Sequence, residues 1–122
     1  MSKYHNKKAV YNGMVFDSKK EMNRYIELSL LENAGKISKL KRQVEYLLIP
    51  AQFGMVTDDK GKKKRVCLER ACYYIADFTY YENGKLVVED VKSGYKKSNA
   101  YSNFVIKRKL LLLNYGIRIK ET

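Results

Sequence analysis

Residues 74–92 read YIADFTYYENGKLVVEDVK, and this stretch predicts two paired β-strands. β-branched and aromatic residues, which favour strands, fill both halves of it. Asn83-Gly84 lies between the halves, and Asn-Gly at the centre of a two-residue loop is a strong hairpin signal. The hairpin therefore sets Asp77, in the first strand, beside Asp90 in the second.

The acids near the open end of this hairpin suggest a metal site. Side chains alternate along a strand, so Asp90 and Lys92 share one face, while Glu89 and Val91 take the other. The two carboxylates of Asp77 and Asp90 suit a hard cation such as Mg²⁺. Water molecules and phosphate oxygens would complete the coordination shell of the ion. A nearby lysine orients an attacking water or neutralises negative charge on a phosphate. The pattern predicts phosphodiester hydrolysis.

Each of these residues also has a purely structural interpretation. Asp77 would be a strand acid paired with Arg70 or Lys85, because a buried carboxylate needs a partner. Asp90 and Lys92 would form a surface ion pair of little energetic value. Glu89 would replace Asp90 as a ligand if a bulge shifted the strand.

The elements around the hairpin complete an α-β-β-β-α-β order. Ser18-Lys19-Lys20-Glu21 matches a capping box and predicts a helix over about 18–34, which Gly35 ends. The other expected elements are a turn or short hairpin over 11–16, strands over 44–50, 65–81, 86–92 and 117–119, and a helix over about 98–114. Residues 57–64, with two acids and four lysines, predict either a solvated turn or a loop that grips phosphates. The fold class is α/β (α+β) with a mixed central sheet.

Composition points to a polyanionic partner. The 122 residues fit one domain, expected over 11–122, with residues 1–10 as a flexible basic leader. A net charge of +12 exceeds what solubility requires and favours nucleic acid over a membrane surface. No apolar run approaches the roughly 18 residues of a membrane span, and no signal peptide is evident, so we expect no membrane association. His5 is the single histidine, and Cys67 and Cys72 predict buried or half-buried thiols rather than a zinc site.

Three segments resemble a known family. They are residues 16–21 (FDSKKE), 74–78 (YIADF) and 88–94 (VEDVKSG), joined by Phe104-x-x-Lys107 in the second helix. The order of elements and the Asp77…Asp90-x-Lys92 pattern look like the PD-(D/E)XK nuclease superfamily. More narrowly, the segments resemble the phage and prophage family DUF1064.

The resemblance implies a restriction-endonuclease-like core and a Mg²⁺-dependent DNA endonuclease, with Mn²⁺ as a substitute metal. Asp77 and Asp90 would bind the metal together with the Val91 carbonyl, and Lys92 would be the catalytic lysine. Glu21 matches an accessory acid that approaches the metal directly or through water, although it equally suits a role in the helix cap alone. The expected substrate is branched DNA, such as a Holliday junction in phage recombination or replication, and the expected assembly is a homodimer in the cytoplasm of a bacterial host.

Two other functions remain open at this point: a phage nickase or general nuclease, and a non-catalytic nucleic-acid-binding module on the same fold. In each case the basic residues near the hairpin and on the helices are expected to contact phosphate. These are Lys19, Lys20, Arg24, Lys96, Lys97, Lys107 and Lys109. Gln43 is a candidate substrate contact, and Tyr95 and Tyr101 either stack on exposed bases or pack within the protein.

Overall fold

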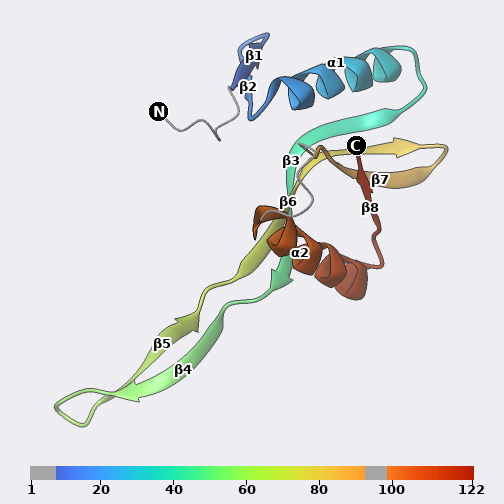
Figure 1. Ribbon diagram of the computed structural model, residues 1–122. Helices are drawn as coiled ribbons and strands as arrows, with labels where there is room; N and C mark the ends of the chain where they lie inside the picture. The colour runs from blue at the N-terminus through green and yellow to red at the C-terminus, as the bar shows by residue number, and fades with distance from the viewer. Residues whose placement is uncertain (1–7, 93–98) are drawn as a thin grey trace.

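The computed structural model describes residues 8–92 and 99–122 and has an α+β architecture (Figure 1). The sequence-predicted hairpins, helices and mixed sheet are all present. The elements are β1 (Ala9–Tyr11), β2 (Met14–Phe16), α1 (Lys19–Asn33), β3 (Ser38–Ile49), β4 (Gln52–Thr57), β5 (Lys63–Glu69), β6 (Cys72–Glu82), β7 (Lys85–Asp90), α2 (Asn99–Tyr115) and β8 (Ile119–Glu121). β1 starts at Ala9, inside the range expected to be leader.

The boundaries of α1 follow from its capping residues. Ser18 is the N-cap, and its Oγ accepts a hydrogen bond from the Glu21 backbone N–H at 3.1 Å. At the other end Gly35 adopts a φ of +76°, and the Lys36 N–H reaches the Leu31 carbonyl at 2.9 Å. This left-handed ending is the Schellman arrangement that a glycine after the helix favours.

A four-stranded mixed sheet carries the site. Its order is β3-β6-β7-β8, in which β3, β6 and β7 pair antiparallel and β7 pairs with β8 in parallel. The β6–β7 hairpin turns through Asn83 and Gly84, with φ of +53° and +76°, as the Asn-Gly signal predicts. The described part of the chain has no helix long and apolar enough to cross a membrane.

The structure corrects the sequence expectation for residues 36–71. β3 begins at Ser38 rather than at residue 44, because its basic residues pair along the edge of the sheet where their side chains reach water. The single strand expected over 65–81 is divided into β5 and β6, and an unexpected strand, β4, pairs with β5 as a separate hairpin. Residues 57–64 are the solvated turn of that hairpin together with the adjoining strand ends. Cys67 and Cys72 are free thiols as expected, but Cys67 is exposed.

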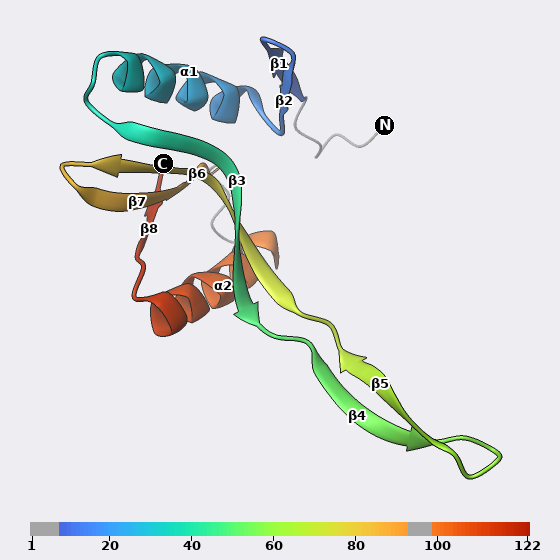
Figure 2. The ribbon, with the colours of Figure 1, turned by 180° about the vertical axis from the view of Figure 1, so that it is seen from behind.

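Two core clusters join the sheet to its two helices, which lie beside different parts of the long β3–β6 pair (Figures 1 and 2). One joins the sheet to α1, and its buried members are Leu28, Ile37, Phe78 and Tyr80. The other joins the sheet to α2, and its buried members are Leu48, Tyr74, Ala76, Val88, Phe104 and Leu111. The strands of the sheet therefore contribute buried side chains to both clusters.

The side chains of β6 pack in different core clusters on the two sides of Asp77. Strict alternation would place Ala76 and Phe78 on one face, yet Ala76 packs in the α2 cluster and Phe78 in the α1 cluster. The neighbouring strand has an irregularity at the same level, where Gln43 adopts a left-handed φ of +53° between the pairs Arg42–Phe78 and Val44–Ala76. Such a residue interrupts the pleat of a strand. Asp77 thus lies where the sheet passes from one helix to the other.

Candidate functional site

Asp77 and Asp90 lie at the same level of two adjacent antiparallel strands. Phe78 of β6 pairs with Glu89 of β7, so Asp77 and Asp90 follow as the next opposed residues. Their negative charges interact, and an Asp77 Oδ2 atom accepts a hydrogen bond from the Val91 N–H at 2.8 Å. The predicted neighbourhood of the two acids on the sheet is confirmed, while metal ligation by them and by the Val91 carbonyl stays a prediction.

Lys92 approaches Asp90 as the sequence predicts. Its Nζ forms an ion pair with Asp90 Oδ2, and the same ammonium lies 3.1 Å from the centroid of the Phe104 ring. A cation over an aromatic face is stabilised by the ring electrons. One wall of the site, Phe104, therefore comes from α2 and helps to fix the lysine.

Glu21 brings α1 to the same place. Its carboxylate accepts hydrogen bonds from the Asp17 N–H at 3.1 Å and from Gln43 Nε2 at 3.2 Å, and it lies close enough to Asp77 for its charge to contribute to the raised pKa of Asp77. In a capping box the carboxylate would instead return to the N-cap N–H, here that of Ser18. Glu21 thus caps the segment before the helix while facing the acids of the sheet. A depression of about 340 Å³ opens beside it, lined by Lys8, Val15, Asp17, Glu21, Arg42 and Gln43.

Burial and neighbouring acids raise the pKa of Asp77. Burial raises the pKa of Asp77 to about 7, aided by the charge of Asp90 and opposed by the Val91 hydrogen bond. Burial also raises the pKa of Glu21. Carboxylates this close favour a proton or a cation between them.

A divalent metal fits this donor set in a particular way. Among residues 8–92 and 99–122, no three His, Cys, Asp or Glu side chains are grouped closely enough to hold an ion by themselves. Mg²⁺ does not need such a cage, because it commonly binds through one or two carboxylates plus water and substrate phosphates. Asp77 and Asp90 are such a pair of oxygen donors, and a cation would relieve their repulsion.

Replacing Asp77 by asparagine should stabilise the metal-free protein at neutral pH. The folded-state pKa of Asp77 lies above its unfolded value of 3.8, so wild-type stability falls as the pH rises from about 4 through 7. The asparagine avoids that loss and still accepts the Val91 hydrogen bond. We expect urea unfolding to show a gain of at least about 1 kcal/mol at pH 8 that vanishes near pH 4. A gain that is equal at both pH values would contradict the raised pKa.

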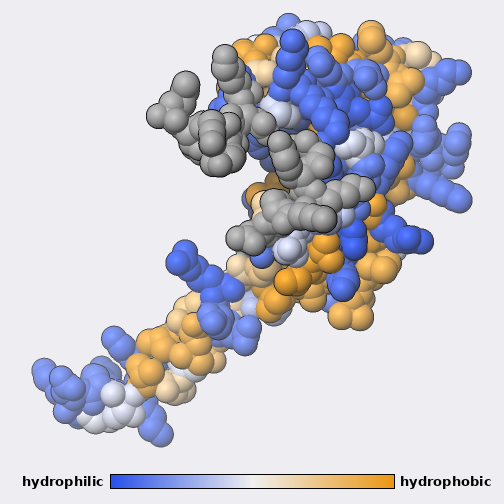
Figure 3. All heavy atoms as spheres, in the orientation of Figure 1, coloured by the Kyte–Doolittle hydropathy of each residue, from blue (hydrophilic) through white to orange (hydrophobic). Residues whose placement is uncertain are grey.

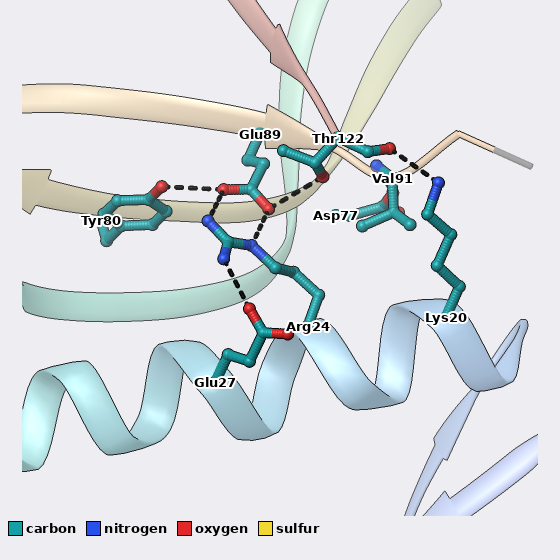
Figure 4. A network of polar contacts seen from close by, with 8 residues as sticks. All are labelled: Lys20, Arg24, Glu27, Asp77, Tyr80, Glu89, Val91 and Thr122. Atoms are coloured by element: carbon teal, nitrogen blue, oxygen red, sulfur yellow. Dashed lines mark hydrogen bonds and ion pairs between the residues drawn. The ribbon is translucent and has the colours of Figure 1, made fainter.

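Glu89 serves a structural network on the α1 side of the sheet (Figure 4). Its fully buried carboxylate accepts hydrogen bonds from Arg24 Nε at 2.6 Å and from Arg24 Nη2 at 2.9 Å. Tyr80 Oη and Thr122 Oγ1 donate to it at 2.8 and 3.1 Å. Because Arg24 already pairs with its carboxylate, Glu89 is a poorer candidate ligand than Asp90, and the choice of Asp90 over Glu89 stays a prediction.

The same network changes the interpretation of Arg24. Its guanidinium also contacts Glu27 at 3.0 Å, so three of its nitrogen atoms have carboxylate partners within the protein. The hydrogen bond to Glu89 is the largest cause of an increase in the pKa of Arg24. These contacts favour a structural role over the phosphate contact that the sequence suggested.

The predicted phosphate-binding lysines are distributed differently around the site. Lys20 Nζ donates to the backbone carbonyls of Lys92 and, at 3.2 Å, of Thr122, which ties α1 to the end of β8 (Figure 4). Lys19 and Lys109 are exposed and Lys107 is half-buried. Lys96, Lys97 and Tyr95 lie outside the described residues. Tyr101 packs against Phe104 and donates to Glu121 at 3.2 Å, which supports its packing interpretation.

Sequence reasoning missed two supports of the site. Tyr74 is not among the candidate site residues, yet its hydroxyl donates to Asp90 Oδ1 at 2.9 Å. The position of Tyr74, three residues before Asp77 in the same apolar strand, was the available sign that it lies near the acids. Thr122 continues the β7–β8 pairing: its N–H donates to the Asp90 carbonyl at 3.0 Å, and its carbonyl accepts from the Lys92 N–H at 2.8 Å. No sequence pattern marks this closure.

The fold and the site define an α+β protein with acids from two strands and one helix gathered beside a lysine. In a comparison with known families the chain matches "Protein of unknown function (DUF1064)" over residues 1–120. The chain belongs to this DUF1064 family. No curated protein and no solved structure matches it.

Proposed function

We propose that the protein is a divalent-metal-dependent DNA endonuclease with a core of the PD-(D/E)XK type. The observation that carries the proposal is the convergence of Asp77, Asp90 and Glu21 beside Lys92. The four residues come from β6, β7, α1 and the segment after β7, so the fold rather than local sequence brings them together. A buried carboxylate costs stability unless a cation or hydrogen-bond donors compensate its charge, and acids with a raised pKa gathered at one place are typical of functional sites.

Each residue has a role in this proposal. Asp77 and Asp90 hold Mg²⁺, which when bound polarises the scissile phosphate and lowers the pKa of water. Lys92, fixed by Asp90 and Phe104, places a positive charge where negative charge develops on the phosphate. Glu21 accepts a proton or orients a water beside Asp77, and Gln43 holds the Glu21 carboxylate in place.

A cleavage panel tests the proposal. Linear, flapped, forked and four-way DNA should each be incubated with Mg²⁺ and with Mn²⁺, and we expect cleavage of at least one branched substrate in preference to linear duplex. RNA of matched sequence is the control that tests whether cleavage requires deoxyribose. A protein that binds these DNAs but cleaves none with either metal would overturn the proposal.

A non-catalytic binding module is the second candidate. The observation that favours it is the occupation of both Asp90 oxygens, by Tyr74 and by Lys92. In addition, no three His, Cys, Asp or Glu side chains in the described part of the chain are grouped closely enough to hold a metal ion. In that case the acids would only shape the surface, and adding Mg²⁺ would leave the thermal stability unchanged.

A resolvase acting on four-way junctions should be a symmetric dimer, because it cuts two strands related by a two-fold axis. We therefore expect sedimentation equilibrium to give twice the chain mass of 14.3 kDa for the protein alone, or two chains for each junction in the complex with DNA. A single chain in solution and a single chain on each junction would favour a nickase instead.

A further inference from the structure

The β4–β5 hairpin stands apart from the rest of the molecule. In both ribbon views it projects beyond the β3–β6 pair as an arm, here defined as residues 52–69, away from both helices (Figures 1 and 2). An isolated two-stranded ribbon is only marginally stable in water. A feature of this kind therefore gains from a partner that the described chain does not supply.

The arm exposes apolar side chains on both of its faces. Phe53, Met55, Val56 and Leu68 are 48%, 63%, 38% and 61% exposed. Phe53 and Met55 share one face with their cross-strand partners Cys67 and Arg65, while Val56 lies on the other face opposite Lys64. A hairpin packed on a core would instead bury one face and solvate the other.

The far end of the arm is strongly cationic. Residues 57–65 contain five basic residues against two acids, a net charge of +3. One of the acids, Asp58, is used in the turn, where its carboxylate accepts the N–H groups of Lys60 and Lys62 at 2.9 and 2.8 Å. Within the described ranges none of the five cations forms an ion pair. Apolar atoms along the arm thus lead to a hydrophilic tip (Figure 3).

We propose that the arm is a DNA-contacting β-ribbon, which lies in a groove of the duplex flanking the site of cleavage. The major groove is about 12 Å wide and admits a two-stranded ribbon. Lys62, Lys63 and Lys64 bind phosphates at the groove wall, and the exposed apolar side chains contact sugars and base edges. The inference rests on the proposed function for its choice of DNA as partner, but it does not require cleavage.

Charge selects DNA over a second copy of the chain. Each chain carries +12, and the tip is positive as well, so two arms or an arm and a body repel one another. DNA supplies the opposite charge at a density of about one phosphate per 1.7 Å of helix axis. The six residues of β4 extend about 20 Å, so the arm reaches duplex well beyond the cleaved bond.

Two matched triple variants test the arm. One carries Lys62→Gln, Lys63→Gln and Lys64→Gln, and the control carries Lys36→Gln, Lys41→Gln and Lys85→Gln, all exposed positions on the body. Both lose three charges. Affinity for a branched DNA with long duplex arms is measured by anisotropy without divalent cation, over a range of salt.

The arm variant should bind at least about tenfold more weakly near 0.1 M salt, with a slope of log affinity against log salt that is smaller by about 2 to 3. The control triple should stay close to wild type. Met55→Ser should weaken binding several-fold with the slope unchanged, because an apolar contact releases no counterions.

Equal weakening by the two triples would overturn the arm proposal and leave the nuclease proposal intact. A fall in oligomer mass caused by the arm triple would also overturn it and assign the arm to contact between copies. Wild-type protein that binds no DNA would remove both the arm proposal and the proposed function.

Discussion

Replacing Asp90 by asparagine should lower DNA cleavage by several orders of magnitude while the protein remains folded. Asparagine has nearly the same shape and still accepts the hydrogen bond from Tyr74. It removes one negative charge from the proposed metal site, so affinity for Mg²⁺ falls and activation of phosphate and water is lost. DNA binding without metal should persist or tighten, because one acid no longer repels phosphate.

Lys92→Ala should lose cleavage in a different way. The carboxylates remain, so Mg²⁺ binds, but the positive charge that stabilises the transition state is gone. Calorimetric Mg²⁺ titration, DNA affinity and cleavage rates should therefore be compared for the two variants. Glu89→Gln is the matched control, because Glu89 faces Arg24 rather than the site, and its folded fraction should cleave. An inactive Glu89→Gln beside an active Asp90→Asn would transfer the ligand role to Glu89.

Arg24→Met should reduce the free energy of unfolding by about 3–5 kcal/mol at pH 7, the usual cost of leaving a buried charge without its partner. The Glu89 side chain is 0% exposed, and it would retain only neutral donors, the hydroxyls of Tyr80 and Thr122. Urea unfolding measures the loss. The control Glu27→Gln removes an acid that is 64% exposed and should change stability by less than about 0.5 kcal/mol.

The effect of Arg24→Met should shrink in acid. Burial alone would raise the pKa of Glu89, but the hydrogen bonds from Arg24 and Tyr80 outweigh it and hold the pKa below 4.5. The pair therefore contributes stability above about pH 4.5, and this contribution disappears as the pH falls through the folded-state pKa. The double variant Arg24→Met/Glu89→Leu should recover much of the stability, because no charge remains buried. A loss that is the same at pH 3 and pH 7 would show that packing by the arginine stem, rather than charge, is responsible.

Local signals in the sequence predicted much of this fold. The Asn83-Gly84 turn fixes the β6–β7 hairpin, and with it the pairing that brings Asp77 to Asp90. Ser18 and Gly35 fix the ends of α1. In each case one or two residues determine the backbone, so a single sequence is sufficient.

The features that were missed depend on distant residues. Arg24 and Glu89 are 65 positions apart, and nothing near either residue identifies the other as its partner. Gln43 is not a typical residue for a left-handed backbone, so the change of face at Asp77 is a tertiary effect. The sequence predicts one strand over 65–81 and so joins part of the arm to β6. Residues 63–69 have strand propensity like β6, and the sequence does not show that they stay exposed while β6 is buried.

The closure of the site by β8 has a consequence for synthesis of the protein. The backbone of Asp90 and Lys92 is held by Thr122, and the Glu89 carboxylate takes a hydrogen bond from the same residue. A ribosome makes β6 and β7 first, and the segment after Asp90 has no strand beside it until residues 119–122 emerge. The nascent chain therefore lacks an assembled site until these residues have emerged, and a protein proposed to cut DNA acquires its active geometry only after residues 119–122 have been made.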